Sequence, residues 1–329
     1  MNKQIQVLGS QETENLRDRL LKQAGEDEKI KRIIEGRAEP EKIVGSGKII
    51  NFTHLFKDTY HPATVNAVSF SQDGKYLAVG CDDGFVHLFG IKEQEGSSLK
   101  QKDLKSIISK SLHYDPVNSV SLSPNGDYLA TASKDFIVIR EFNKDNNEWD
   151  YLTEKCYRDG VCDVAFSPGG KYLAAGGLDQ RLHVYEFNTR EIKQIAEKRH
   201  SGGPVFALAF GHDIRYLVTA CGDMHARVFE FDGNKLNQIT KKLHSTEIHH
   251  GIAFSHDDKY IAVAERYASH LGEHKNIAFY EFDGKNLVKS DVELRLNVND
   301  LAFSPNGKYI ALAYDTFMSL WQINREKNE

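Results

Sequence analysis

The chain has 329 residues, of which 40% are hydrophobic, so it is long enough to bury a sizeable core without disulfides or a structural metal. Its formal net charge of -5 comes from 42 basic and 47 acidic residues mixed along the chain, which argues against nucleic acid as a partner. The four cysteines lack the spacing of a zinc site, the N-terminus lacks the apolar run of a signal peptide, and no stretch approaches the ~18 apolar residues of a membrane span. We therefore expect a soluble, cytoplasmic protein with no cofactor and no membrane partner.

Residues 1–44 are predicted to form a short helical N-terminal extension. Apolar residues recur there at three- and four-residue spacing with charged residues between them, at Leu16, Leu20, Leu21, Ile30, Ile33 and Ile34. Gly25 separates the two runs, and each run is too short to form a stable isolated helix. Either the runs pack on the rest of the chain, or residues 11–37 bind a partner or a second copy in an oligomer.

One phrase is repeated six times in the remainder of the chain. It begins at Val65, Val117, Val161, Val205, His249 and Val298, and each copy has a tyrosine at its twelfth position. These tyrosines are 52, 44, 44, 44 and 49 residues apart, a period that indicates a propeller or a solenoid rather than independent domains. Within each copy, two alternating apolar runs flank a polar turn, which is typical of a β-hairpin.

Each repeat is predicted to form one four-stranded sheet. A third strand follows the hairpin, as in RLHVYEF at 181–187, and a fourth is expected in runs such as IKQIAEK and LNQITKKL. Such a sheet is apolar on both faces, and stacking the sheets around an axis covers those faces. Residues 45–329 are therefore predicted to form an all-β, six-bladed propeller.

The last repeat ends too soon to supply its own fourth strand, because only six residues follow Gln322 and Ile323. Segment 47–57, just before the first repeat, has the pattern of one strand. We expect it to pair with residues 318–323 and so to close the ring.

From Val65 to its end the chain resembles the WD-repeat propellers, whose repeats end the third strand in Trp-Asp and place an aspartate in the preceding turn. The matching residues are Asp83, Asp135, Asp179, Asp223 and Asp315, with Trp321 at the strand end. The resemblance implies a hydrogen-bonded chain of histidine, aspartate, hydroxyl and tryptophan within a blade. Histidines match at His61, His113, His200 and His244, and hydroxyls at Thr131 and Thr219. No repeat has all four members, and we expect these residues to order turns rather than to perform chemistry.

The fifth repeat differs from the others because residues 265–276 lengthen the turn between its second and third strands. In the WD-repeat topology this turn lies on the same face as the connection leading into the blade, residues 244–250. The candidate partner-binding residues of these two segments are His244, His249, His250, Arg266, Tyr267, His270 and His274. Arginine and tyrosine are enriched in interface hot spots, and histidines make a contact sensitive to pH. Imidazoles also suit zinc, copper or nickel, but we favour a contact patch and expect no metal.

The sequence favours a non-catalytic scaffold or adaptor that binds other proteins or peptides through variable loops on the propeller faces. It contains no phosphate-binding loop, nucleophile elbow or HExxH motif, and the repeat shows no identifiable set of inward carboxylates or histidines. Two alternatives remain open. One is a propeller enzyme such as a lactonase or hydrolase, and the other is a reader of a modified peptide at the mouth of the axial channel.

Overall fold

The computed structural model describes residues 41–45, 48–57, 63–92, 99–100, 103–157, 159–189, 191–243, 247–269, 272–294, 296, 298–314 and 316–325. The predicted helical runs fall on residues 1–40 and lie outside the described residues. The described residues form strands and turns, with no α-helix among them. In the same part of the chain, no helix is long and apolar enough to cross a membrane.

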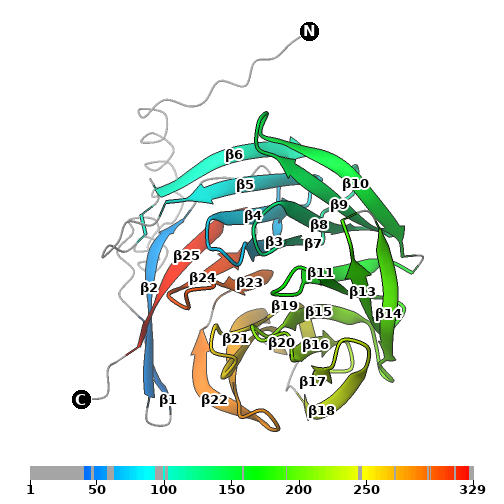
Figure 1. The fold of residues 1–329 in the computed structure, drawn as a ribbon. Coiled ribbons are helices and arrows are strands. Elements are labelled where there is room, and N and C mark those ends of the chain that lie inside the picture. Colours follow the sequence, from blue (N-terminus) through cyan, green and yellow to red (C-terminus); the bar gives the residue numbers. More distant parts are fainter. Residues whose placement is uncertain are drawn as a thin grey trace. The chain divides into compact units, whose positions relative to one another are not determined.

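Six antiparallel sheets, here called blades 1 to 6, are arranged around one axis (Figure 1). Blade 1 contains β3 (Val65–Phe70), β4 (Tyr76–Cys81), β5 (Phe85–Ile91) and β6 (Leu104–Ser111). Blade 2 contains β7 (Ser119–Leu122), β8 (Tyr128–Ser133), β9 (Phe136–Asn143) and β10 (Glu148–Cys156). Blade 3 contains β11 (Val161–Phe166), β12 (Tyr172–Gly177), β13 (Arg181–Phe187) and β14 (Ile192–Arg199).

Blade 4 contains β15 (Val205–Phe210), β16 (Tyr216–Cys221), β17 (His225–Phe231) and β18 (Leu236–Leu243). Blade 5 contains β19 (Glu247–Phe254), β20 (Tyr260–Ser269), β21 (Gly272–Phe282) and β22 (Leu287–Leu294). Blade 6 contains β23 (Asp300–Phe303), β24 (Tyr309–Ala313), β25 (Met318–Arg325), β2 (Lys48–Lys57) and β1 (Glu41–Gly45). Each innermost strand contacts those of both neighbouring blades, and β23 contacts β3, so the ring is closed. The prediction of an all-β, six-bladed propeller is confirmed.

Blade 6 takes strands from both sides of the repeat region. β2 pairs antiparallel with β25, from Ile50 opposite Arg325 to Lys57 opposite Ser319. β1 adds a fifth strand outside β2. Because β1 includes residues 41–44, the predicted N-terminal extension does not reach residue 44; the run EKIVG is too short to show a strand pattern in the sequence.

Apolar side chains fill the space between every two neighbouring blades, in six buried clusters. In blades 1 to 4 the tyrosine at the twelfth repeat position also enters this space, toward a phenylalanine at the end of the third strand of the next blade. The pairs are Tyr76–Phe142, Tyr128–Phe187, Tyr172–Phe231 and Tyr216–Phe282. Their ring centroids are 5.0 to 6.0 Å apart and their planes meet at 75° to 88°, the edge-to-face geometry that aromatic pairs favour. The repeated tyrosine therefore joins blades.

Asparagines at the second position of three repeats also join neighbouring blades. The side-chain amide of each donates to the backbone carbonyl at the first position of the next repeat, in the pairs Asn66–Val117, Asn118–Val161 and Asn299–Val65, at 3.0 to 3.2 Å. The pair Asn299–Val65 connects blade 6 to blade 1. Ring closure thus rests on a hydrogen bond at the inner strands as well as on the β2–β25 pairing.

Shortening the chain from its N-terminal side tests the contribution of β1 and β2. A chain that begins at residue 58 leaves the backbone groups of β25 that pair with β2 without partners. Because each hydrogen bond contributes roughly 0.5–1.5 kcal/mol, we expect the free energy of unfolding to fall by about 3 kcal/mol or more, measured by urea denaturation. The control chain begins at residue 41 and keeps both strands. Equal unfolding free energies for the two chains would contradict the prediction.

Candidate functional site

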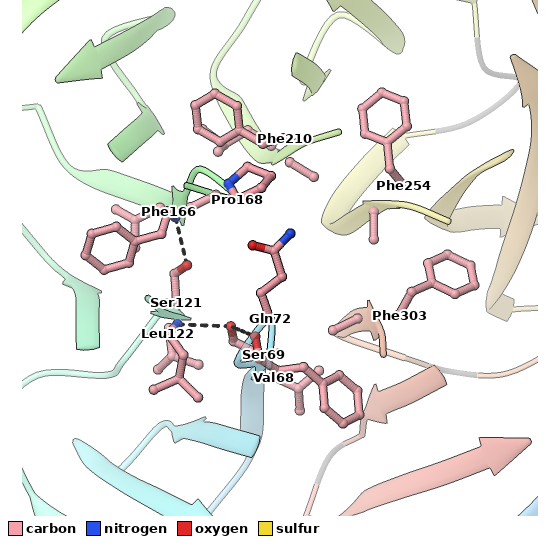
Figure 2. Close-up of a pocket in the computed structure, with 18 of the residues that line it drawn as sticks. Val68, Ser69, Gln72, Ser121, Leu122, Phe166, Pro168, Phe210, Phe254 and Phe303 are labelled. Atoms are coloured by element: carbon pink, nitrogen blue, oxygen red, sulfur yellow. Dashed lines mark hydrogen bonds between the residues drawn. The ribbon is translucent and has the colours of Figure 1, made fainter. Parts of the chain in front are cut away.

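The axis of the ring holds a pocket of about 190 Å³ lined by the innermost strands of all six blades and by the turns that follow them. Its wall is largely aromatic, because the sixth repeat position holds Phe70, Phe166, Phe210, Phe254 and Phe303, with Leu122 in blade 2. Four of these rings surround the pocket in Figure 2, where the side chain of Gln72 projects into the space between them. Prolines 124, 168 and 305 line the end formed by the turns.

The innermost strand of each blade has one edge that faces the axis and has no strand partner. Side chains of the preceding blade accept hydrogen bonds from several backbone N–H groups on these edges, in place of a neighbouring strand. At the third repeat position, the acceptors are Ser119 for Val164 N (3.2 Å), Asp163 for Leu208 N (2.6 Å) and Asp300 for Val68 N (2.9 Å). At the fifth position, they are Ser69 for Leu122 N (3.1 Å) and Ser121 for Phe166 N (2.9 Å), as drawn in Figure 2.

Asp163 and Asp300 are thus two carboxylates that line the axial pocket from blades 3 and 6. The expectation that the repeat contains no inward carboxylates is wrong, because the third position of the inner strand faces the axis. Burial raises the pKa of Asp163 to about 6, although hydrogen bonds from Ser119 and two backbone N–H groups favour its charged form. Burial and the charge of Asp163 raise the pKa of Asp300 well above its usual range. The pair therefore holds protons more readily than exposed aspartates do.

Two histidine–hydroxyl pairs implied by the family resemblance are formed. His113 Nε2 lies 2.7 Å from Thr131 Oγ1 in blade 2, and His200 Nε2 lies 3.0 Å from Thr219 Oγ1 in blade 4. Burial lowers the pKa of both histidines to about 4, so both rings are neutral at pH 7. A neutral, enclosed imidazole bonded to a threonine supports a structural role.

The turn aspartates have different partners in different blades. Asp179 accepts hydrogen bonds from Arg181 N at 2.9 Å and from Tyr157 Oη at 3.1 Å, and it lies 2.7 Å from His183 Nε2. Asp223 binds the guanidinium of Arg227 through both carboxylate oxygens, and these hydrogen bonds hold the pKa of Asp223 below its usual range.

The remaining predicted turn residues have simpler environments. Asp83 accepts from Phe85 N at 3.1 Å, and the backbone carbonyl of Asp135 accepts from Tyr157 N. Trp321 Nε1 donates to Ser319 Oγ at 2.9 Å. Asp315 lies outside the described residues.

The extra residues of the fifth repeat lengthen a hairpin rather than a loop, which corrects the sequence interpretation. β20 and β21 remain paired from Tyr260 opposite Glu281 to Ser269 opposite Gly272, because both segments can extend the antiparallel ladder. In this extension Arg266 lies opposite Lys275 and Tyr267 opposite His274. His249 and His250 belong to β19, the neighbouring strand, while His244 and His270 lie outside the described residues. The backbone therefore brings five of the seven candidate residues into three adjacent strands of blade 5.

One face of the ring exposes large apolar side chains that the sequence interpretation missed. The turns between second and third strands lie on this face together with the connections that lead into the blades, as shown by the hydrogen bonds Val161 N to Lys134 O and Leu178 N to Gly160 O. Four exposed apolar residues lie in these turns and connections or directly beside them in blades 2, 3 and 4: Tyr114, Phe136, Leu178 and Met224. The positions of these residues within the repeat could have predicted the face of the ring on which they lie. They could not have predicted that the side chains are exposed.

No group of three or more His, Cys, Asp or Glu side chains suited to hold a metal ion is found within the part of the chain that the structure describes.

The fold and its repeats define the class, a propeller whose blades are copies of one sequence unit. The family described as WD domain, G-beta repeat matches residues 53–89, 105–139, 151–186, 192–230 and 293–322, more than half of the chain. The chain belongs to this family. The matches leave out residues 231–292, which contain most of blade 5 and its lengthened hairpin.

Two curated relatives match part of this chain. Protein HIRA of Dictyostelium discoideum is 39% identical over 87 residues, which are 26% of this chain and 8% of that protein. Pre-mRNA-processing factor 19 homolog 2 of Arabidopsis thaliana is 28% identical over 120 residues, 36% of this chain and 20% of that protein. The matched part of this chain thus spans a fifth or less of these relatives.

Two solved structures show the same fold at low sequence identity. A chain in the crystal structure of a mitotic checkpoint complex is 18% identical, with a TM-score of 0.59 over 85% of this chain and 82% of that one. The β-propeller domain of Myceliophteria thermophila Cps50 (Swd1) is 16% identical, with a TM-score of 0.59 over 83% of this chain and 100% of that domain.

The contacts of Asp179 predict a large effect of its removal. Asp179→Ala leaves Arg181 N and the Tyr157 hydroxyl without their acceptor, so we expect the free energy of unfolding to fall by about 1–3 kcal/mol in urea denaturation. Asp83→Ala is the matched control, because this carboxylate accepts from Phe85 N in the same turn of blade 1, and a loss of at most about 1 kcal/mol is expected there. Similar losses in both variants would show that the additional partners of Asp179 add nothing.

The buried histidines predict a loss of stability in mild acid. The pKa of His200 is depressed to about 4 in the folded chain, whereas the unfolded chain titrates near 6.5 and therefore binds the proton first as the pH falls. Between pH 7 and pH 5 we expect His200 to lower the free energy of unfolding by about 1–2 kcal/mol, a loss that His200→Gln removes. His256→Gln, at an exposed histidine, serves as the control and should keep the wild-type pH dependence. Parallel pH profiles for wild type and His200→Gln would contradict this assignment.

Proposed function

We propose that this protein is a non-catalytic, cytoplasmic scaffold or adaptor that binds other proteins or peptides through one face of its propeller. The binding face is the one that carries the turns between second and third strands. The lengthened hairpin of blade 5 extends one of these turns, so the candidate residues His249, His250, Arg266, Tyr267 and His274 are proposed to belong to it, together with His244 and His270.

The exposed apolar residues of this face are the observation that carries the proposal. Tyr114, Phe136, Leu178 and Met224 are exposed on consecutive blades 2, 3 and 4, and exposed apolar groups that recur on one side of a molecule mark contact sites. The other large exposed apolar residues of the described chain, Tyr151 and Val288, lie on the outermost strands β10 and β22. A partner seated on the face would cover the apolar residues of three blades at once.

The environment of the axial carboxylates supports a binding role over hydrolysis. Asp163 accepts three hydrogen bonds from the protein and Asp300 accepts two, and four of the five come from backbone N–H groups of the same or the next blade's inner strand at 2.6–2.9 Å. Carboxylates engaged in this way hold blades together. The occurrence of a similar propeller in a structure of a mitotic checkpoint complex also supports an assembly role.

Variants of the exposed apolar residues test the proposal. The triple variant Tyr114→Ser, Leu178→Ser and Met224→Ser is expected to keep its folding, because these side chains are exposed, and to lose at least ~10-fold in recovery of specific partners, as expected when hot-spot contacts are removed. Affinity capture from lysate, quantified by mass spectrometry at equal bait concentration, measures the loss. A second variant replaces residues 266–274 by a short Gly/Ser turn and tests the blade 5 hairpin separately.

The control is Tyr151→Ser with Val288→Ser, which removes exposed apolar side chains from the rim. Its partner recovery should match that of the wild type. If the triple variant and the hairpin variant both capture the wild-type set of partners, the proposed face is wrong. Loss in the rim variant alone would move the interface to the outer strands.

A further inference from the structure

The axial pocket has two chemically different ends. The end formed by the turns is lined by prolines 124, 168 and 305 and by the phenylalanines of the sixth repeat position. Three residues further along the strands, Asp163 and Asp300 line the inner end with Ser119. At about 3.3 Å per strand residue, this places the carboxyl positions roughly 10 Å along the axis from the aromatic positions.

The volume of the pocket limits what it can hold. At about 190 Å³ it is smaller than the ~300–1000 Å³ of typical small-molecule pockets, and it suits a single long side chain. An alkyl stem fits the aromatic and proline-lined section, because burying its methylenes there removes apolar surface from water on both partners.

The two carboxylates have capacity left for a cation. An ionised carboxylate offers about four acceptor sites. Protein donors take three on Asp163 and two on Asp300, which leaves about three acceptor sites between them. Among the described residues that line the pocket, none is lysine or arginine.

The pair is also electrostatically strained in its charged form. Each carboxylate is partly buried at the axis, and the charge of Asp163 disfavours ionisation of Asp300. A cation placed near both would offset the burial of each charge and their mutual repulsion, whereas a neutral group of the same shape would offset neither.

We propose that the axial pocket binds one basic side chain of a partner peptide, with its alkyl stem along the phenylalanine-lined section and its ammonium or guanidinium group at Asp163 and Asp300. This site is separate from the apolar face and stands independently of the proposed scaffold function. Lysine and arginine share the required chemistry, and the two are distinguished by experiment.

Calorimetric titration of the full chain with capped pentapeptides tests the site. The peptide acetyl-Gly-Gly-Arg-Gly-Gly-amide is compared with its citrulline analogue, which has the same shape and no charge, and the lysine peptide is compared with norleucine. At pH 7.5 we expect arginine or lysine to bind at least ~10-fold more tightly than its neutral analogue, since charge-assisted hydrogen bonds to carboxylates are stronger than neutral ones. Asp300→Asn should remove most of this preference, and Asp163→Asn serves if the first variant does not fold.

Two controls separate this site from general charge effects. Asp83→Asn removes a carboxylate in a turn outside the pocket and should leave the affinity unchanged. Lowering the pH to 5.5 favours the protonated form of Asp163, whose pKa is raised to about 6, and should weaken binding of the charged peptides. His212, the other titratable residue among the described lining, is tested by His212→Gln, which should keep this pH dependence. Equal affinities for charged and neutral peptides, unchanged affinity in both aspartate variants, or no wild-type binding at about 5 mM peptide would overturn the proposal.

Discussion

The inner edges of the six sheets impose the constraint on which the ring depends. An innermost strand hydrogen-bonds to a strand on one side only, so its other edge presents backbone N–H groups to the axis. In an open sheet water or another chain would satisfy them, but here the edges converge around a small pocket. Serine and aspartate side chains from the preceding blade accept several of these bonds, and each bond crosses a blade boundary. The same contacts therefore provide acceptors for the backbone N–H groups and align neighbouring blades.

Contacts further from the axis repeat this arrangement with different chemistry. Asparagine amides join the beginnings of neighbouring repeats, and tyrosine–phenylalanine pairs join the second strand of one blade to the third strand of the next. At the position of this phenylalanine, the third strand of blade 6 has Ile323 and the third strand of blade 1 has Ile91. Blade 6 is also where β2 pairs with β25, and from its inner strand region Asn299 and the carboxylate of Asp300 both reach across to blade 1.

The sequence was sufficient to predict the blades because their pattern is local and repeated. Strand alternation, turn residues and the period of the tyrosines predict which residues form strands and how many sheets there are. The same alternation could not show which positions line the axis, because both faces of a blade are covered by neighbours and the channel is lined by an edge. Asp163 and Asp300 were missed for this reason, although their signal was present as two acidic residues at one repeat position that otherwise holds alanine, serine or glycine. In blade 5, length alone indicated an insertion, whereas only backbone pairing shows that it extends β20 and β21.

The composition of blade 6, with strands from both sides of the repeat region, has a consequence for folding during synthesis. Its β2 and β25 strands are separated by the whole of the other five blades, so their pairing is among the most distant contacts in the chain. During synthesis β2 emerges first and must wait for nearly all of the remaining residues before its partner exists. Blades 1 to 5 contain only their own consecutive strands and have no such delay. Non-local pairing slows folding, and unpaired strand edges exposed in the interval promote aggregation. Closure of blade 6 is therefore the folding step before which a strand edge of the nascent chain stays unpaired for longest.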